Sequence, residues 1–498
     1  MSNNIAFIDF QKPYRNQGVI EAEVPLGFLF LSHPLKKEGY STKLFSYWKG
    51  VHNLNNFLND IVAYNPKICA LNGTFGIFGS ELVEILEKIK SKLPDIISIF
   101  GGIAVSSCPE SYLQEKCVDY VCLGEGEFSF LQFCNAVFSG NNPQDIPGIC
   151  NNLKDREINN EIQIIPDLSK VDMDLDLIDW NDYTKKIGKS VILYSLQTSR
   201  GCPFSCNFCY RSAIKVKYRM FPIEKIISWV SYIKSKTNCN YITMIDDHFF
   251  VNKRRSFELI KRFDSIGVSL SNLDLRMEDI NDELFDFAQR YNIKSFFVGL
   301  ESPLDHVLKR INKRITNQQI ENVCNILQRW PNIAIAGSLM LCTPGMTDQD
   351  LVKTINFAIE KLKTIPNFVM DFTVFKPFPG TVFYKEIISH YPQYTIKTLK
   401  DYEICGSNGR YGLEWCSVSE KYRLYIYELK DFFMFNSRVY RMLSEKKIPL
   451  ANIQFKIMEY QLKHFKLISI VNIIFYFSWN FLWTIQPFRI WFLRRIGR

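Results

Sequence analysis

The chain has 498 residues, of which 47% are hydrophobic and 22% are charged. This composition is typical of a globular protein and excludes a disordered chain, and the length allows two or three domains. The net charge of +9 is modest for this length and partly concentrated at the C-terminus, so no nucleic-acid partner is expected. Fourteen cysteines and an N-terminus too polar for a secretory signal predict a reduced, cytoplasmic environment.

Strands and helices alternate through residues 1–150. Five short apolar runs predict strands, at residues 5–8, 42–45, 68–71, 96–100 and 119–123. The stretches between them predict helices at 26–39, 57–64 and 82–93. This alternation predicts a doubly wound, Rossmann-like parallel sheet. Ligands of such sheets bind at the carboxyl ends of the strands, where Gly101, Gly102 and Gly124 follow the fourth and fifth strands here.

After a polar, acid-rich stretch at 151–189, which is predicted to be a linker, residues 190–390 contain six strand–helix pairs. The predicted strands are 191–197, 241–245, 268–275, 295–300, 333–341 and 368–375. Six such units predict a partial (β/α)6 TIM-like barrel, whose functional groups belong at the carboxyl ends of its strands. The residues that follow those strands are Asp246, Asp247, Arg276, Glu301, Ser302 and the turn Thr343-Pro344-Gly345. The alternative for each single charged residue is a solvated side chain at the barrel rim.

Three cysteines in C-x3-C-x2-C spacing follow the first barrel strand: Cys202, Cys206 and Cys209. A [4Fe–4S] cluster normally takes four protein thiolates, so three of them leave one iron open for a small molecule. The alternatives are a zinc site and unrelated buried cysteines. A zinc site usually shows a second cysteine pair or a histidine pair, and neither follows here.

At these residues, and from 196 to 379 in general, the chain resembles the radical SAM superfamily. The resemblance implies that the three cysteines hold the cluster, whose open iron binds S-adenosylmethionine (SAM). One electron then cleaves SAM to a 5′-deoxyadenosyl radical. Residue chemistry suits Glu301 to the ribose hydroxyls or ammonium of SAM, and Arg276 to its carboxylate. The residues predicted to contact SAM are Tyr210, Asp247, Arg276, Glu301, Ser302 and Pro344.

The first 150 residues resemble the cobalamin-binding domain of B12-dependent radical SAM enzymes. The resemblance rests on Pro25-Leu26-Gly27, the stretch 101–106 and Gly124-Glu125-Gly126-Glu127. It implies cobalamin contacts from Thr74, Phe75, Gly101, Gly102, Ser106, Gly124 and Glu125. The D-x-H-x-x-G motif that supplies a histidine to cobalt is absent, so Phe75 and Phe78 are candidates for packing against the lower face of the corrinoid. The alternative is a Rossmann-like domain that binds no cofactor.

Residues 391–498 are predicted to be mainly helical. The stretch 467–488 carries no charge and is rich in Ile, Phe and Trp, and four arginines lie in the last ten residues. This tail has three alternatives: a helix packed on the barrel, a helix lying in a membrane interface, and a spanning helix. A peripheral membrane contact through 467–498 would indicate a lipid substrate.

Together these features predict a cobalamin-dependent radical SAM enzyme, most simply a C-methyltransferase. In that family one SAM methylates cobalamin and a second yields the radical that activates the substrate carbon. The expected partners are a small-molecule, lipid or peptide substrate and an electron donor such as flavodoxin or ferredoxin. The alternatives are a cyclisation or rearrangement without methyl transfer, and a non-catalytic corrinoid or Fe–S binding module at a membrane. Methylthiolation is disfavoured because no extra cluster cysteines and no C-terminal β-barrel pattern are found.

Overall fold

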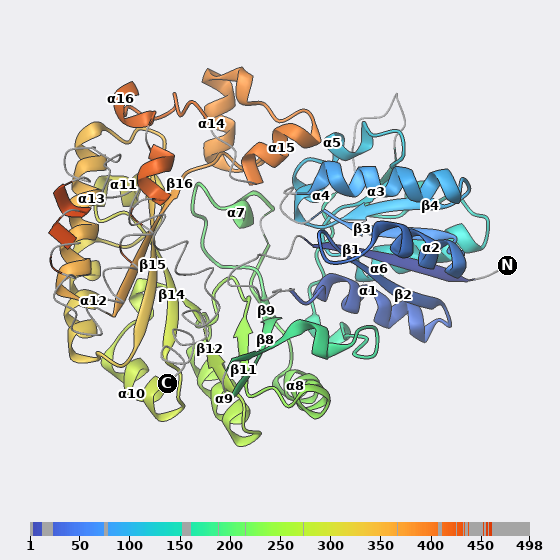
Figure 1. Cartoon of the computed structure of the whole chain (residues 1–498), viewed down its shortest axis with the longest axis horizontal. Coiled ribbons are helices and arrows are strands. Elements are labelled where there is room, and N and C mark those ends of the chain that lie inside the picture. The colour runs from blue at the N-terminus through green and yellow to red at the C-terminus, as the bar shows by residue number, and fades with distance from the viewer. Residues whose placement is uncertain are drawn as a thin grey trace.

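The computed structural model describes residues 3–11, 23–73, 78–151, 161–187, 189–214, 216–271, 273–365, 367–406 and 411–424, with scattered positions from 426 to 460. Two α/β units lie side by side, and helices from the region after the second unit lie across their upper side (Figure 1). The predicted tail at 467–498 and the predicted cobalamin contacts Thr74 and Phe75 lie outside the described residues. None of the described helices is long and apolar enough to cross a membrane.

The first unit is a six-stranded sheet in the order β2-β1-β3-β4-β5-β6, parallel except for its last strand. The strands are β1 (Asn4–Gln11), β2 (Ser41–Trp48), β3 (Ile68–Asn72), β4 (Ile97–Gly101), β5 (Tyr120–Cys122) and β6 (Ile149–Asn151). The doubly wound fold predicted from the sequence is confirmed. Strand β1 extends past its predicted end through Asp9, and the antiparallel β6 was not predicted.

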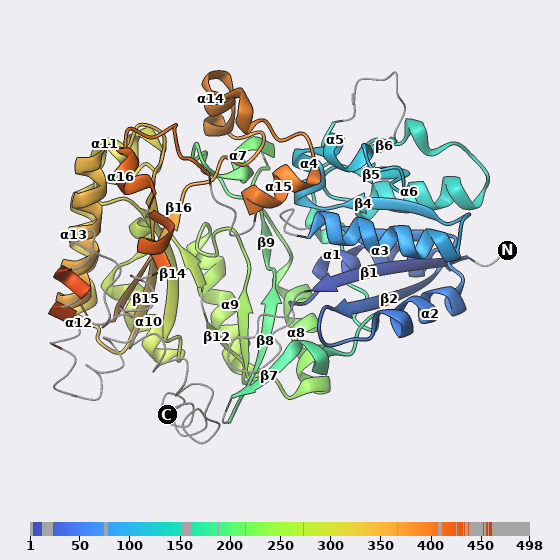
Figure 2. The same cartoon turned by 45° about the horizontal axis from the view of Figure 1, so that its top comes forward.

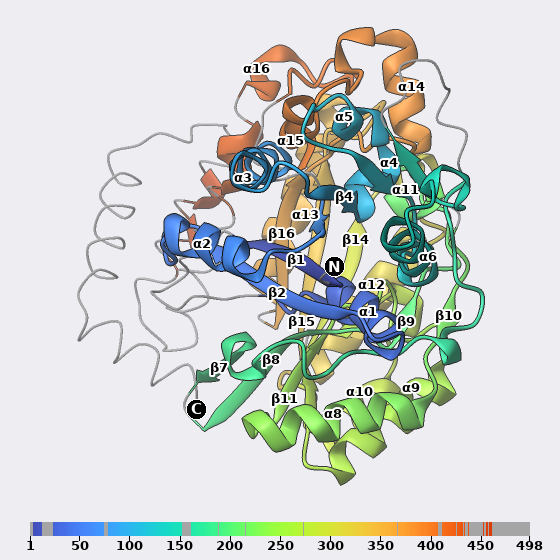
Figure 3. The ribbon, with the colours of Figure 1, turned by 90° about the vertical axis from the view of Figure 1, so that its right-hand side faces the viewer.

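Helices cover both faces of this sheet (Figure 3). One face carries α1 (Leu26–Lys37) and α6 (Glu127–Phe138), and the other carries α2 (Leu54–Tyr64), α3 (Gly79–Lys92), α4 (Ile103–Ser107) and α5 (Pro109–Leu113). Along β1, Ile5 and Phe7 enter one buried cluster while Ala6 and Ile8 enter the other. A parallel sheet covered on both faces therefore gives the continuous apolar run seen in the sequence.

Burial makes the stability of this unit depend on pH through Asp9. The Asp9 side chain accepts hydrogen bonds from Gln11 Nε2 (3.0 Å) and Ser46 Oγ (3.3 Å). Burial raises the pKa of Asp9 from 3.8 to about 7, and this outweighs the hydrogen bonds, which lower it. The folded state thus retains a proton that the unfolded state has lost, so stability falls as the pH rises from about 4 to about 7.

We therefore expect Asp9→Asn to stabilise the protein at pH 8, by up to a few kcal/mol, and much less at pH 5. The amide oxygen keeps both acceptor contacts and carries no charge. Thermal unfolding at the two pH values measures the difference, with Asp60→Asn on the exposed side of α2 as the control. A stabilisation that is equal at pH 5 and pH 8 would contradict the assignment.

The second unit contains six parallel strand positions. They are β8 (Ser190–Leu196), β11 (Tyr241–Met244), β12 (Ser269–Ser271) with β13 (Leu273–Leu275), β14 (Ser295–Glu301), β15 (Ala334–Leu341) and β16 (Phe368–Val374). The short segments β12 and β13 lie on either side of residue 272. Strand β12 pairs with β11 and β13 with β14, so the order follows the chain. This confirms the predicted partial barrel, to which the antiparallel β7 (Thr184–Ile187) adds an edge.

Helices lie outside these strands (Figure 1). The helices are α8 (Ile223–Thr237), α9 (Lys253–Ser265), α10 (Asp282–Arg290), α11 (Asp305–Arg310), α12 (Asn317–Arg329) and α13 (Asp348–Thr364). In β14, Phe296 and Val298 are fully buried, whereas Phe297 between them is 41% exposed. Because side chains alternate along a strand, Phe297 lies on the inner face.

The linker predicted at 151–189 packs tightly where it is described. Leu168, Met173 and Trp180 are buried in the same cluster as residues of α1 and α8. Asp174 accepts a hydrogen bond from Ser32 Oγ in α1 (2.7 Å), and Asp172 accepts one from Trp229 Nε1 in α8 (2.7 Å). The segment therefore joins the two units through buried contacts as well as by covalent connection.

After the barrel, the chain returns to the first unit through α14 (Val382–His390) and α15 (Leu399–Gly406). Helix α15 lies beside α4 (Figure 2), where the hydroxyl groups of Tyr402 and Ser107 are 2.9 Å apart. Glu403 accepts a hydrogen bond from the backbone N–H of Ser80, which satisfies a free amide at the start of α3. The sequence pattern did not predict this second attachment.

Candidate active site

A cavity of about 200 Å³ opens at the carboxyl edge of the first sheet. Its wall is mainly apolar, with Phe28, Ile99 and Phe130 among the lining residues, and Asn72, Glu125, Glu127 and Arg200 add polar groups. The volume is below the range of pockets that enclose a whole drug-sized ligand. The cavity is therefore suited to part of a larger ligand, such as the predicted cobalamin.

Glycines form part of this wall and leave room that side chains would fill. Gly27 lies in the first turn of α1, where glycine destabilises a helix by about 1 kcal/mol relative to alanine. A Cβ added at Gly27 would meet no atom within 4 Å. Gly101 is also open, since its nearest contact would be Cys122 at 3.9 Å. The first unit therefore fits a bound cofactor at this edge.

The two glycine loops are fixed in place by their backbone geometry and by Ser106. Gly102 has φ +104° and Gly124 has φ +87°, and a Cβ at either would come within 2.4 Å of a neighbouring oxygen. Ser106 Oγ donates to the carbonyl of Gly102 (2.9 Å) and accepts from the N–H of Gly124 (2.8 Å). The structure thus brings these three predicted residues together, with Gly102 and Gly124 on the cavity wall and Ser106 behind them. Phe78 lies at the start of α3 with its ring 5.3 Å from that of Phe10.

The cluster loop is the segment 201–218 between two short strands, β9 (Ser199–Arg200) and β10 (Arg219–Met220). These strands pair antiparallel and close the base of the loop. Cys202, Cys206 and Cys209 all lie on it, ahead of and at the start of α7 (Tyr210–Ile214). Cys206 is buried and the other two are half-buried.

The three thiols of the cluster loop lie near enough to influence one another electrostatically. Burial raises the pKa of Cys202, and it raises that of Cys209 to about 11, with smaller contributions from the neighbouring thiols. Among the described residues, no group of three metal-ligating side chains converges on a single ion. A [4Fe–4S] cluster does not require this, because each thiolate ligates a different iron. Three thiols on one short loop fit such a cluster, and its charge would favour their ionised form.

Two neighbouring carboxylates at the end of β11 hold the base of this loop. Asp246 is 1% exposed and accepts hydrogen bonds from the backbone and hydroxyl groups of both Thr198 and Ser199. Asp247 accepts from the N–H of Gly201 (3.0 Å) and from Arg211 Nε (2.6 Å). Asp247, a predicted SAM contact, thus holds the cluster loop through its carboxylate oxygens, and its contact with SAM stays a prediction.

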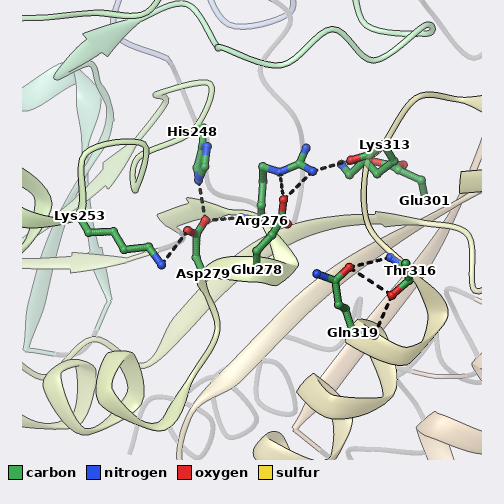
Figure 4. A network of polar contacts seen from close by, with 9 residues as sticks. All are labelled: His248, Lys253, Arg276, Glu278, Asp279, Glu301, Lys313, Thr316 and Gln319. Atoms are coloured by element: carbon green, nitrogen blue, oxygen red, sulfur yellow. Dashed lines mark hydrogen bonds and ion pairs between the residues drawn. The ribbon is translucent and has the colours of Figure 1, made fainter. Parts of the chain in front are cut away.

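Arg276, another predicted SAM contact, also lies against the cluster loop. Its guanidinium group lies 3.7 Å from the ring centroid of Phe204, between the first two cluster cysteines. Its Nε donates to Glu278 (2.8 Å), and its Nη2 donates to the carbonyl of Lys313 (Figure 4). Stacking on an aromatic ring with a carboxylate at the edge orients the guanidinium plane.

Glu301 and Ser302 end β14 at a bulge in its pairing with β15. Glu301 has φ +66°, a conformation that is unfavourable for a side chain other than glycine and that often occurs at functional sites. Its carboxylate, 7% exposed, accepts from Lys313 Nζ at 3.3 Å (Figure 4). Ser302 is fully buried, and its Oγ accepts a hydrogen bond from the N–H of Leu304 (3.2 Å).

The remaining predicted SAM contacts lie at two further points. Tyr210 begins α7 directly after Cys209, with the Arg211 guanidinium 4.8 Å from its ring centroid. Pro344 is buried in the turn after β15, where the N–H of Gly345 donates to the carbonyl of Trp415 (3.3 Å). Trp415 thus attaches the region after the barrel to this turn.

Several polar residues of the site were not singled out from the sequence. Lys313, Arg211 and Arg219 make the ion pairs described here, yet none of them follows a predicted strand. Asp274 lies on β13, and burial together with the charges of Asp246 and Asp247 raises its pKa to about 7. The sequence could have identified Asp274 as a candidate site residue, because an acidic residue within the apolar run of a predicted strand is unusual.

Glu125, a predicted cobalamin contact, also pairs with the barrel. Arg219 binds its carboxylate through both terminal nitrogens at 2.7 and 2.8 Å, and the N–H of Ile165 donates to it at 2.7 Å. Burial by itself raises the pKa of Glu125, but Arg219 and Arg200 outweigh it and hold the pKa below its ordinary value. Glu125 therefore stays ionised in a site that spans both units.

Comparison with known proteins gives two domain matches. The model of the B12 binding domain matches residues 21–133, and that of the radical SAM superfamily matches residues 196–358. An uncharacterized methyltransferase of Pyrococcus horikoshii is 24% identical over 74% of this chain and 79% of its own. An anaerobic magnesium-protoporphyrin IX monomethyl ester cyclase of Synechocystis sp. is 22% identical over 66% and 67%. The hopanoid C-3 methylase of Methylococcus capsulatus is 22% identical over 72% and 67%.

Two solved structures share the fold. The radical SAM methyltransferase TsrM from Kitasatospora setae, with cobalamin and a [4Fe–4S] cluster bound, has a TM-score of 0.61 at 16% identity, covering 78% of this chain and 75% of its own. The cobalamin-dependent radical enzyme OxsB, with aqua-cobalamin and SAM bound, has a TM-score of 0.67 at 15% identity, covering 92% and 71%. At these identities the likeness establishes the arrangement of the two units.

Proposed function

We propose, on the premise that this chain is a radical SAM enzyme with an N-terminal B12 binding domain, that it methylates an unactivated carbon of its substrate. The observation that carries the proposal is Arg200. It lines the cavity of the first unit and stands two residues before Cys202, so this cavity reaches the start of the cluster loop. Methyl transfer needs both cofactors near one substrate, and this contact supports that arrangement.

Each cofactor has a set of residues suited to it. Cys202, Cys206 and Cys209 would hold the [4Fe–4S] cluster, and the glycine-lined cavity would hold the tail of cobalamin. When bound, the cluster supplies the electron that cleaves SAM to a 5′-deoxyadenosyl radical, and cobalamin carries the methyl group. Glu301, held by Lys313, would accept hydrogen bonds from SAM, and Arg276 stacks on Phe204 within the cluster loop.

The overall reaction balances with an external reductant. One SAM gives its methyl group and leaves as S-adenosylhomocysteine, and a second SAM is split into methionine and 5′-deoxyadenosine. The substrate C–H bond breaks, with the hydrogen atom passing to the deoxyadenosyl carbon, and a C–CH3 bond forms. Two electrons are consumed per turnover, and we assign them to a low-potential donor of the flavodoxin or ferredoxin class.

The inner face of the barrel suits a substrate with an apolar portion. Phe297 on β14 is 41% exposed, and Ile245 at the end of β11 is 45% exposed. Ser338 and Thr373 place hydroxyl groups 3.3 Å apart on the neighbouring β15 and β16. This mixture of apolar and hydroxyl groups accommodates a small molecule, a lipid or a peptide side chain.

The first test is the metal and corrinoid content of protein purified without oxygen from cells supplied with cobalamin. We expect about four irons and one corrinoid per chain. Incubation with trideuteromethyl-SAM, a reductant and a metabolite extract should then yield a product that carries three deuterons. Four irons without corrinoid would exclude cobalamin-dependent methylation.

A second reaction class is favoured by one observation. Anaerobic magnesium-protoporphyrin IX monomethyl ester cyclases are among the relatives of this chain. A cyclisation or rearrangement would use both cofactor sites without methyl transfer. The same incubation separates the two, because such a reaction forms 5′-deoxyadenosine with the substrate but leaves no deuterium in the product.

A further inference from the structure

Four charged residues, Glu125, Glu127, Arg200 and Arg219, meet where the two units join. Arg219 binds Glu125 through two nitrogens (2.7 and 2.8 Å). Arg200 Nη2 lies 2.6 Å from Glu127 Oε1, and its Nη1 lies 3.6 Å from Glu125 Oε1. All four side chains are at most 17% exposed. We call this group the latch.

The two arginines of the latch belong to the base of the cluster loop. Arg200 lies directly opposite Arg219 in the antiparallel pair of β9 and β10. Like charges in this position repel, so the ribbon by itself disfavours closure of the loop. The two glutamates come from the first unit, Glu125 just before α6 and Glu127 as its first residue, and they supply the compensating charge. The loop base therefore depends on the first unit for its charge balance.

Arg200 is further fixed by aromatic rings from both units. Its guanidinium carbon lies 4.7 Å from the ring centroid of Phe30 in α1 and 5.4 Å from that of Phe221, which follows β10. The two rings stack on one another at 5.4 Å. A displacement of α1 or of the glutamates would consequently move the arginine that precedes the first cluster cysteine.

The same latch residues form part of the cavity wall. Glu125, Glu127 and Arg200 all line it, together with Gly27 and Phe28 of α1. A group that enters the cavity thus contacts the carboxylates and the helix that hold Arg200. The position of the cluster loop and the occupation of the cavity are linked by one contiguous set of buried contacts.

We propose that the latch couples the two cofactor sites, with Arg200 as the positioning residue, so that cobalamin and the [4Fe–4S] cluster each strengthen the binding of the other. This inference rests on the proposed function, because it requires both cofactors. Coupling of two binding equilibria is reciprocal and reaches fivefold or more in typical cases. The structure supplies the physical link through Arg200, Glu125 and Glu127.

The test is a binding cycle on the full chain with hydroxocobalamin as the probe. Its dissociation constant is measured by equilibrium dialysis for the cluster-free protein and again after anaerobic reconstitution of the cluster. We expect at least fivefold tighter binding in the reconstituted wild type. Glu127→Gln keeps the shape of the side chain and removes its charge. In this variant the ratio of the dissociation constant without the cluster to that with the cluster should fall close to one. Because Glu127 also lines the cavity, the readout is this ratio of the two dissociation constants and not the affinity of the variant itself.

A second readout and a matched control complete the design. With excess dithionite present, which reduces both the cluster and the bound corrinoid, the electron paramagnetic resonance signal of the cluster should differ between corrinoid-loaded and corrinoid-free wild type and not in Glu127→Gln. Glu224→Gln removes a glutamate–arginine pair with Arg262 on the surface and should leave the ratio unchanged. Arg219→Lys keeps the positive charge but cannot make the two-nitrogen contact with Glu125. It replaces Glu127→Gln as the test variant if Glu127→Gln does not fold.

The possible outcomes separate this inference from the proposed function. A wild type that binds both cofactors with independent affinities overturns the latch and leaves the proposed function standing. The latch is also overturned if the folded Glu127→Gln or Arg219→Lys variant still binds hydroxocobalamin at least fivefold more tightly with the cluster than without it. A wild type that binds no hydroxocobalamin overturns both.

Discussion

Replacement of Cys202, Cys206 and Cys209 together by alanine is expected to reduce the iron content from about four per chain to background and to abolish SAM cleavage. The three thiols lie on one loop, between strands that are fixed by Asp246 and by the pairing of β9 with β10. No other described group of side chains is arranged to take over as metal ligands. Each single alanine variant is expected to lose SAM cleavage as well.

Iron analysis and the formation of 5′-deoxyadenosine with dithionite measure this effect. Cys324→Ala is the control, because Cys324 is also a free thiol but lies buried on α12, outside the cluster loop. The control should retain iron and SAM cleavage, and similar far-ultraviolet circular dichroism should show that both proteins are folded. Continued formation of 5′-deoxyadenosine by the triple variant would disprove the cluster site.

Gly27→Phe is expected to weaken cobalamin binding by about two orders of magnitude, or about 3 kcal/mol. Gly27 lies at the cavity wall, and a Cβ there meets nothing within 4 Å, so an aromatic side chain would occupy part of the 200 Å³. The substitution should not destabilise α1, since glycine is the less favourable residue in a helix. The iron content should remain unchanged because the cluster loop is not altered.

Dialysis against hydroxocobalamin measures the loss for Gly27→Phe. Gly27→Ala adds one methyl group to the same position and should bind hydroxocobalamin within a few-fold of the wild type. Wild-type affinity in a folded Gly27→Phe variant would show that cobalamin does not use this cavity. Far-ultraviolet circular dichroism distinguishes a loss of cobalamin binding from a disturbed fold.

The sequence was sufficient to predict the features that depend on the local spacing of residue types. The spacing of three cysteines fixes a cluster loop because all the ligands lie within eight residues of one another. The alternation of apolar runs with amphipathic stretches fixed the doubly wound sheet and the six barrel units, since burial on both faces of a parallel sheet requires such runs. The domain matches confirm the resemblance to B12-dependent radical SAM enzymes. The ends of strands were harder to predict from the sequence. Asp9 lies inside β1, but an acidic residue at the end of an apolar run resembles the start of a loop.

The tertiary structure decided which polar side chains meet. Asp247 pairs with Arg211 and the backbone of Gly201, and Glu125 is held by an arginine 94 residues further along the chain. A carboxylate at the end of a strand can serve a ligand, a backbone amide or an arginine equally well. Its partner depends on how separate units pack, and no local spacing encodes that packing. The sequence therefore determined the cofactor chemistry, and the packing of the two units determined how the cofactor sites are joined.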